Sequence, residues 1–284
     1  MKVLITGAGG QLGTALVRVC TAAGDDVIAA DRASLDIAVR DQVLGSITAL
    51  APDVVVSVGA WTAVDDCEAD PSRAFATNAL GVRHLAEGCR LAGAHLLHVS
   101  TDYVFDGSLE RPYNEWDATN PRSVYGASKL AGEREAIDGC PGAAILRTAW
   151  VVGPHGSNML RTILRLAGDP DRELAFVDDQ VGNPTFSDDL AALLRRIAVT
   201  RAPGIFHGTN QGSTSWFGFA QAVLAAAGHN PDRVRPISTS ELTPPRAAPR
   251  PANSCLAAPA LTGAGFDLLD DFHVPLERTV AALT

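Results

Sequence analysis

The chain has 284 residues, of which 46% are hydrophobic and 19% charged, and its formal net charge is −9. This length and composition are typical of a globular protein with a substantial core and exclude a disordered or fibrous chain. Because acidic and basic residues are mixed and no long basic run occurs, we expect no nucleic acid as main partner, since binding its phosphates needs a positive surface.

In the first half of the chain, short apolar runs alternate with stretches of helical periodicity. Strands are predicted over residues 2–6, 27–31, 53–58, a run through Val99, and 143–148. Helices are predicted over residues 11–23, 39–50, about 71–91 and about 123–137. Strands that alternate with helices of this length pair in parallel through right-handed crossovers. The pattern therefore predicts an α/β protein with a Rossmann-type doubly wound parallel sheet.

After Gly153 the alternation becomes less regular. Helices are predicted over residues 159–167, 190–199 and 216–227, with short strands such as 204–207 between them. A proline-rich segment over residues 231–251 predicts an extended surface loop. We therefore expect a dinucleotide-binding domain over residues 1–152 and a smaller α/β substrate lobe over residues 153–284, some strands of which could return to the main sheet.

The first predicted strand runs directly into the glycine-rich stretch TGAGGQLG. Gly7, Gly10 and Gly13 lie between strand and helix, where glycines allow a tight turn, the approach of a pyrophosphate and close helix packing. The phosphates would bind the free N–H groups of the helix N-terminus. Asp31, at the end of the second strand, suits a ribose diol, whereas Arg32 suits a 2′-phosphate. A dinucleotide site is predicted, and the choice between NAD and NADP stays open.

A second turn of small residues follows the third predicted strand. This turn consists of Gly59, Ala60, Trp61 and Thr62, at the same edge of the sheet as the glycine-rich stretch. Small side chains there would let the cofactor lie close to the backbone. An ordinary turn without a ligand is the alternative interpretation.

Tyr125 and Lys129 are four residues apart in a predicted helix and therefore share one face. A tyrosine pKa near ~10 is too high for ready proton exchange at neutral pH, and a lysine cation nearby would lower it. The lysine could also bind the nicotinamide ribose. Such a pair also occurs by chance on solvated helices. Thr101, on the preceding strand, favours a functional pair, because its hydroxyl could bind a substrate oxygen beside Tyr125.

Several motifs together resemble the extended short-chain dehydrogenase/reductase superfamily and, more narrowly, the dTDP-4-dehydrorhamnose reductase family, along nearly the whole chain. They are TGAGGQLG, the helix that begins at Pro71 and contains Asn78, STDYVFDG, VYGASKLAGE, RTAWV and DDQVGNPT. The resemblance implies reduction of the C4 ketone of a dTDP-4-keto-6-deoxyhexose, most closely dTDP-4-dehydro-L-rhamnose to dTDP-L-rhamnose. It also implies NADPH as cofactor, with NADH as the alternative, and a monomer or homodimer.

The same resemblance assigns roles to individual residues. The catalytic set would be Thr101, Tyr125 and Lys129. The cofactor would be bound by Gly7, Gly10, Gln11, Leu12, Gly13, Asp31, Arg32, Asp36, Ile37, Ala60, Thr62 and Lys129. The dTDP-sugar would contact Thr101, Asp102, Tyr103, Tyr125, Trp150, Asn158, Gln180, Arg250 and Asn253. Trp150 could instead be an ordinary core residue. Asn158, Gln180, Arg250 and Asn253 could instead make ordinary loop contacts.

The residues after Thr101 bear on the type of reaction. Nucleotide-sugar dehydratases that resemble this region carry an Asp-Glu pair after the threonine, as acid and base for removing water. In this chain Asp102 is followed by Tyr103, so the base is absent. We therefore expect carbonyl reduction without elimination.

We expect neither a metal site nor disulfides. The seven histidines show no ligand spacing, and Ala15 stands where some family members carry a glutamate of a magnesium-bridged dimer. The five cysteines are odd in number, widely spaced and without a CxxC pair, which is typical of reduced thiols. The N-terminus lacks the pattern of a signal peptide and no apolar stretch reaches the ~18 residues of a membrane span. A cytoplasmic protein without a membrane partner is predicted.

Two other functions remain open. One is a 4-ketoreductase for another dTDP-deoxysugar in antibiotic glycosylation, because one sequence does not fix the stereochemistry of the sugar. The other is a non-catalytic, NADP-binding regulatory subunit, since proteins resembling this family modulate a methionine adenosyltransferase. The presence of Thr101, Tyr125 and Lys129 favours an enzyme.

Overall fold

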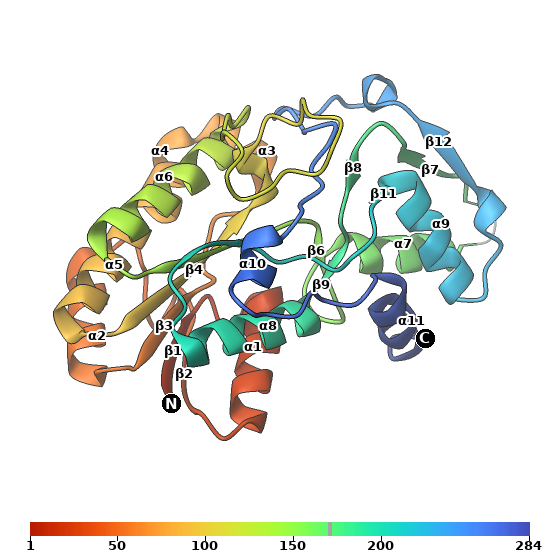
Figure 1. Ribbon diagram of the computed structural model, residues 1–284. Coiled ribbons are helices and arrows are strands. Elements are labelled where there is room, and N and C mark those ends of the chain that lie inside the picture. Colours follow the sequence, from red (N-terminus) through yellow and green to blue (C-terminus); the bar gives the residue numbers. More distant parts are fainter. Residues whose placement is uncertain (170–171) are drawn as a thin grey trace.

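The computed structural model describes residues 1–169 and 172–284 and contains a central parallel sheet (Figure 1). Its six strands follow the order β10-β5-β4-β3-β1-β2. They are β1 (Lys2–Thr6), β2 (Asp26–Ala30), β3 (Val54–Ser57), β4 (His95–Thr101), β5 (Ala144–Thr148) and β10 (Gly204–His207). The predicted α/β fold with a doubly wound parallel sheet is confirmed.

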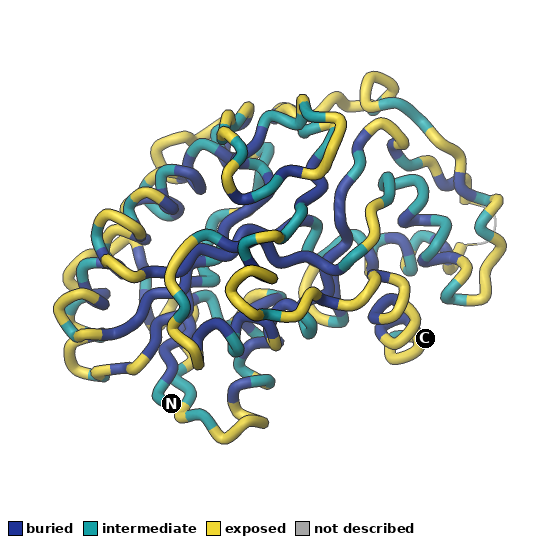
Figure 2. Tube along the Cα trace, in the orientation of Figure 1, coloured by how far each residue is buried: buried dark blue, intermediate teal, exposed yellow. Residues whose placement is uncertain are grey.

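Helices cover both faces of this sheet. Leu4 and Ile5 are neighbours in β1 but belong to two different buried clusters, because successive side chains of a strand point to opposite faces. The cluster of Ile5 includes side chains of α1 (Gln11–Ala22) and α8 (Ser187–Thr200). The cluster of Leu4 includes side chains of α2 (Arg40–Leu50), α5 (Gly81–Ala92) and α6 (Val124–Gly139). Figure 2 shows the buried strands between helices that are exposed on their outer sides.

The strand order reverses next to β1. From β1 the chain crosses to β2 on one side and then to β3 on the other side. In open α/β sheets ligands bind at such a switch point, outside the carboxyl ends of the strands. The turns after β1 and β3 therefore meet where a cofactor is expected.

The long helix predicted from Pro71 is interrupted. It consists of α4 (Pro71–Phe75), a π-helical turn (Ala76–Leu80) and α5. The buried Asn78 lies in the π-helical turn, where its side chain bonds the backbone of Trp61 and the hydroxyl of Ser128. A short helix that was not predicted, α3 (Val64–Ala69), precedes it; its six residues are too few to show helical periodicity.

A third cluster of buried residues forms the core of the smaller lobe. It includes side chains of α7 (Met159–Ala167), α9 (Trp216–Ala226) and α11 (His273–Ala281), beside the parallel pair β7 (Leu174–Val177) and β12 (Val234–Ile237). Other short elements are β6 (Val151–Val152), β8 (Val181–Gly182), β9 (Thr185–Phe186), β11 (Thr214–Ser215), α10 (Pro259–Gly263) and a 3₁₀ turn, Asp102–Val104.

Two details of the second half differ from the prediction. The proline-rich segment is not wholly a loop, because it contains β12 between two 3₁₀ turns, Pro231–Arg233 and Thr239–Glu241. Pro236 is compatible with this strand because β12 pairs with β7 alone, and proline is tolerated on strands with a free edge. The helix expected from residue 190 begins earlier, since α8 starts at Ser187.

The division predicted at residue 152 stays a prediction. The segment after it supplies β10 and α8 to the main sheet and its covering layer, as well as the smaller lobe. Within residues 1–169 and 172–284, no helix combines the length and apolar character that crossing a membrane requires.

Candidate active site

A cavity of about 920 Å³ lies at the carboxyl ends of the strands, where the sheet meets the smaller lobe. Most of the predicted cofactor residues line it: Gly7, Gly10, Gln11, Leu12, Asp31, Arg32, Asp36, Ile37, Ala60, Thr62 and Lys129. The predicted catalytic residues and the nearest predicted sugar contacts also line it: Thr101, Asp102, Tyr103, Tyr125 and Trp150. The cavity is therefore continuous from the glycine-rich turn to the tyrosine and lysine of α6.

The glycine-rich turn depends on close backbone contacts. Gly7 has φ +71°, and a Cβ there would lie 2.6 Å from Gly59 Cα in the turn after β3. A Cβ on Gly13 would collide with the carbonyl oxygen of Gly7. Gly13 does not line the cavity but lets α1 pack beneath the turn. Its predicted role is thus indirect, through the shape of the turn.

These residues fit a dinucleotide. Helix α1 begins at Gln11 directly after the turn, no side chain caps it, and its first turn carries no acidic residue. The first amides of a helix have no partner within the helix, and they bind phosphate well because the helix dipole is positive at this end. Gln11 and Leu12 line the cavity. The pyrophosphate of a dinucleotide would be held there.

Replacing Gly13 with Ala is expected to raise the Kd for NADPH about tenfold or more. The added methyl displaces the turn and with it the amides that would bind the pyrophosphate, and a loss of about 1.4 kcal/mol in binding free energy corresponds to a factor of ten in Kd. Titration of NADPH fluorescence measures the change. Gly45→Ala in α2 is the control, since a Cβ there meets no atom within 4 Å, and an equal loss in both variants would contradict the prediction.

Asp31 and Arg32 lie at the adenosine end expected for the cofactor. Asp31 Oδ1 accepts hydrogen bonds from the amides of Ala33 and Ser34 at 3.0 and 2.9 Å and from Ser34 Oγ at 2.8 Å. These bonds hold the pKa of Asp31 below its usual value. The side chain of Arg32 is 73% exposed, with its Nε 3.4 Å from Asp36 Oδ2. Arg32 is thus available to a phosphate at the mouth of the cavity.

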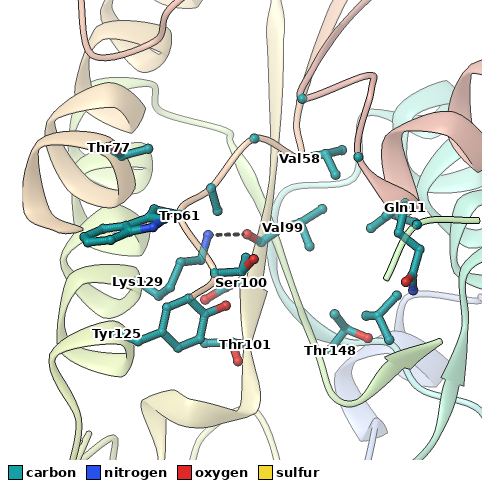
Figure 3. A pocket seen from close by; sticks show the side chains of 18 of the residues that line it. Gln11, Val58, Trp61, Thr77, Val99, Ser100, Thr101, Tyr125, Lys129 and Thr148 are labelled. Atoms are coloured by element: carbon teal, nitrogen blue, oxygen red, sulfur yellow. Dashed lines mark hydrogen bonds between the residues drawn. The ribbon is translucent and has the colours of Figure 1, made fainter. Parts of the chain in front are cut away.

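Thr101, Tyr125 and Lys129 meet on one wall of the cavity (Figure 3). Thr101 ends β4, and Tyr125 and Lys129 lie on one face of α6. The hydroxyl of Ser123 caps α6 by accepting from the amide of Gly126 at 3.1 Å. A Cβ on Gly126 would collide with the carbonyl oxygen of Tyr103, so the first turn of α6 packs tightly on the segment after Thr101. This packing fixes the two helical side chains relative to the strand.

The tyrosine differs from expectation in its protonation. Burial raises the pKa of Tyr125 above its usual value, and the charge of Asp102 raises it further. The predicted net lowering of this pKa does not occur, because burial and the charge of Asp102 dominate. The ammonium of Lys129 donates to the carbonyl oxygen of Val99 at 2.7 Å. Tyr125 is therefore a neutral phenol that can donate a proton.

Asp102 is buried next to this phenol. Its Oδ1 accepts a hydrogen bond from Thr101 Oγ1 at 2.9 Å, which directs the threonine proton toward the carboxylate. Burial raises the pKa of Asp102 to about 6, although hydrogen bonds from Thr101 and Ser254 oppose this. Its position within the cavity lining agrees with the predicted contact to the sugar.

Two stacked tryptophans form the wall next to the smaller lobe. Trp150 has φ +44°, an uncommon conformation for a residue other than glycine, and it stacks on Trp216 with 3.6 Å between ring centroids and 4° between planes. Both line the cavity. Trp216 was not predicted, since it opens α9 far along the sequence and no motif marks it. The pair offers a flat apolar surface to a sugar or a base.

A second aromatic group was also missed. Trp61 follows β3, and the guanidinium carbon of Arg73 lies 4.3 Å from its ring centroid. Both residues line the cavity. Trp61 directly follows Ala60 in the second small-residue turn. This position could have indicated that Trp61 lines the cavity.

Four predicted substrate contacts do not line the cavity and bond other parts of the protein. Asn158 caps α7 by accepting from the amide of Arg161, and Gln180 donates to Thr239 Oγ1 at 2.8 Å. Arg250 forms an ion pair with Asp65 at 2.7 Å, and Asn253 donates to the carbonyl oxygens of Leu109 and Arg111. In this structure these four side chains bond other loops or cap a helix. Their contact with substrate stays a prediction.

Within the described part of the chain, no group of three or more His, Cys, Asp or Glu side chains is arranged to hold a metal. Ala15 is buried in the core beneath β1. All five cysteines are buried and free.

Comparison with known proteins gives a consistent result. The family model described as "RmlD substrate binding domain" matches residues 1–284. A dTDP-4-dehydrorhamnose reductase of Streptomyces griseus is 42% identical, with 99% of this chain and 93% of that protein covered. A probable dTDP-4,6-dihydroxy-2-methyloxan-3-one 4-ketoreductase of Streptomyces antibioticus is 41% identical, with 98% and 94% covered. The structure is similar to that of dTDP-4-dehydrorhamnose reductase from Bacillus anthracis in complex with NADP, with TM-score 0.95, 35% identity and 99% and 100% of the two chains covered.

Proposed function

Because the chain belongs to the RmlD substrate binding domain family, we propose that it reduces the C4 ketone of a dTDP-4-keto-6-deoxyhexose with NADPH. Conversion of dTDP-4-dehydro-L-rhamnose to dTDP-L-rhamnose is the reaction that the relatives support best. The observation that carries the proposal is the convergence of Thr101, Tyr125 and Lys129 on one wall of a cavity whose other end is the glycine-rich turn.

The side chains suit proton donation to a ketone. When bound, NADPH supplies the hydride that the ketone carbon accepts. Tyr125, a neutral phenol, donates its proton to the ketone oxygen and regains one from solvent afterwards. Lys129 faces the same cavity as an ammonium that can bind the ribose hydroxyls. A proton donor aimed at an oxygen that gains charge stabilises the transition state more than the ground state.

The residue after Asp102 supports reduction rather than elimination of water. Tyr103 occupies the place of the dehydratase base, and its ring packs edge-on against that of Tyr125 with centroids 5.5 Å apart. Burial raises the pKa of Tyr103 to about 12, so it is a poor base near neutral pH. Asp102 alone is one carboxyl group where elimination needs two.

A second candidate is reduction of another dTDP-4-keto-sugar. It is favoured by the Streptomyces antibioticus relative, which is 41% identical and is named as a probable 4-ketoreductase for a different sugar. The third possibility, a non-catalytic NADP-binding subunit, predicts a protein partner and no turnover. The complete set of Thr101, Tyr125 and Lys129 favours the enzyme over the subunit.

The test is oxidation of NADPH, followed at 340 nm, with enzymatically generated dTDP-4-dehydro-L-rhamnose and with dTDP-4-keto-6-deoxyglucose as a second substrate. NMR identifies the product. Formation of dTDP-L-rhamnose with the first substrate is expected. Preference for the second substrate would favour the other deoxysugar, and no oxidation with either would contradict the proposal.

Arg32 is expected to favour NADPH over NADH. Replacing Arg32 with Ala should raise the KM for NADPH about fivefold to tenfold and leave that for NADH unchanged, because an exposed contact to a phosphate contributes about 1 kcal/mol. Steady-state kinetics with both cofactors measure this. Arg18→Ala is the control, since Arg18 lies on α1 and pairs with Asp188. An unchanged ratio between the two cofactors would contradict the role of Arg32.

A further inference from the structure

His98 lies beneath the active site and contacts Lys129. It belongs to β4 and is fully buried. Its Nε2 is 3.1 Å from Lys129 Nζ, and its Nδ1 is 3.1 Å from the hydroxyl of Ser57 at the end of β3. Three neighbouring elements, β3, β4 and α6, thus contribute one polar group each to a buried line that ends at the cavity.

This line of hydrogen bonds limits the directions in which the ammonium of Lys129 can donate. An ammonium has three N–H groups. One donates to the carbonyl oxygen of Val99 at 2.7 Å (Figure 3), and a second donates to His98 Nε2 at 3.1 Å. The third remains for the cavity, which Lys129 lines together with Tyr125. The two bonds therefore fix the direction in which the third donor points.

The histidine can accept from an ammonium only as one particular neutral tautomer. Nε2 must carry no proton, so the proton is on Nδ1, where it is donated to Ser57 Oγ. Burial, and next the charge of Lys129, hold the pKa of His98 well below its usual value. The ring therefore stays neutral in the physiological pH range, and Ser57 selects the tautomer that accepts from Lys129.

We propose that His98, held by Ser57, is a positioning residue that fixes the ammonium of Lys129 at the cavity wall and favours its protonated form. This inference rests on the proposed function, in which Lys129 binds the cofactor ribose beside Tyr125. The alternative is a purely structural role, in which His98 fills the core and its ring nitrogens have hydrogen-bond partners. The two differ in what happens to the titration of Lys129 when His98 is replaced.

The direction in which the pKa of Lys129 shifts when His98 is replaced follows from the groups around Lys129. Burial lowers the pKa of Lys129 to about 8, and the charge of Glu133 opposes this. An acceptor for an ammonium N–H stabilises the charged form, so removing it leaves burial less opposed and lowers the pKa further. Functions that need the ammonium are then lost at a lower pH than in the wild type.

Other charged groups near α6 have partners of their own. Glu133, one turn along α6, is paired with Arg147 of β5 and accepts from Ser100 of β4. Further titratable groups on the elements around this face include Asp102 and Tyr103 after β4, Tyr125 on α6, Glu68 and Cys67 on α3, Arg73 on α4, and Arg83 and His84 on α5. These groups are kept in every variant compared below.

The experiment compares His98→Leu, His98→Gln and His95→Leu. Leucine fills the site without an acceptor, whereas the side-chain amide oxygen of the introduced glutamine can replace Nε2. His95 lies on the same strand, is buried, and has no hydrogen-bond partner at Nε2, so it controls for loss of a buried histidine. Two readouts are measured from pH 6 to 10: the Kd for NADPH by fluorescence, and kcat.

For His98→Leu we expect the basic limb of both profiles to move about one pH unit lower, which at pH 8.5 reduces cofactor affinity and kcat several-fold. His98→Gln should regain most of the difference, and His95→Leu should keep the wild-type limb. A lower melting temperature with an unchanged limb in His98→Leu would overturn the proposal. Should that variant not fold, Ser57→Ala is decisive: a smaller shift in the same direction supports the proposal and no shift contradicts it.

Failure of the proposed function gives a different result. If the wild type reduces no nucleotide sugar, the proposed function is contradicted. The pH dependence of NADPH binding needs no sugar and still decides whether His98 sets the titration of Lys129.

Discussion

Replacing Tyr125 with Phe is expected to reduce kcat by roughly 10²–10⁴-fold, the range that general acid catalysis contributes, with the Kd for NADPH nearly unchanged. The phenol is a neutral donor that lines the cavity together with Thr101. Phenylalanine keeps the packing against Tyr103 but lacks the proton. The cofactor turn lies at the other end of the cavity, so its geometry is not affected. Steady-state kinetics and fluorescence titration measure the two quantities.

Tyr113→Phe is the matched control for this variant. Tyr113 is also buried, and its hydroxyl donates to Asp106 at 2.8 Å, but it does not line the cavity. We expect it to lower the melting temperature and to keep kcat. If Tyr125→Phe kept a third or more of the wild-type kcat, the proton donor would have to be another group.

Replacing Arg147 with Met is expected to destabilise the protein by about 3–5 kcal/mol, because it leaves a buried carboxylate without its partner. Arg147 in β5 donates two hydrogen bonds to Glu133 of α6, at 2.9 and 2.7 Å, and the two side chains are 3% and 2% exposed. Ser100 of β4 donates to the same carboxylate at 2.5 Å. This group ties α6, with Tyr125 and Lys129, to the strands beside Thr101.

Urea unfolding measures the loss, and two further variants define its cause. Arg83→Met breaks an ion pair with Glu135 of similar geometry whose side chains are 57% and 25% exposed, and it should cost no more than about 1 kcal/mol. Adding Glu133→Gln to Arg147→Met should recover part of the stability, because the unpaired charge is removed. Equal losses for Arg147→Met and Arg83→Met would show that burial of the charge is not the cause.

The sequence predicted the features that depend on local order. The strand-to-helix glycines, the acid after the second strand and the shared face of Tyr125 and Lys129 all follow from spacing within one or two elements. The alternation of strands and helices likewise predicted the parallel sheet, which the structure confirms. The parallel sheet in turn brings the carboxyl ends of β1, β3, β4 and β5 to one cavity, because parallel strands end at a common edge.

Features that depend on tertiary contacts were not predicted. Trp216 reaches the cavity only because the smaller lobe places α9 against Trp150. The pKa of Tyr125 is raised instead of lowered because burial and Asp102 outweigh a lysine whose ammonium is bonded to Val99 and His98. Loop residues such as Arg250 fit a substrate contact by motif, but its guanidinium is paired with Asp65. A motif therefore indicates which residue is a candidate. The hydrogen-bond and ion-pair partners of that residue depend on the folded chain.

We propose that NADPH bound in this cavity would transfer a hydride to C4 of a dTDP-4-keto-6-deoxyhexose. The most direct test of this claim uses NADPH carrying deuterium at C4 of the nicotinamide, prepared separately on each face, with dTDP-4-dehydro-L-rhamnose as substrate. Mass spectrometry and NMR locate the label in the product. We predict that one of the two labelled cofactors places deuterium on C4 of the sugar. NADPH oxidation that leaves the sugar unlabelled with both cofactors, or no oxidation at all, would contradict the claim.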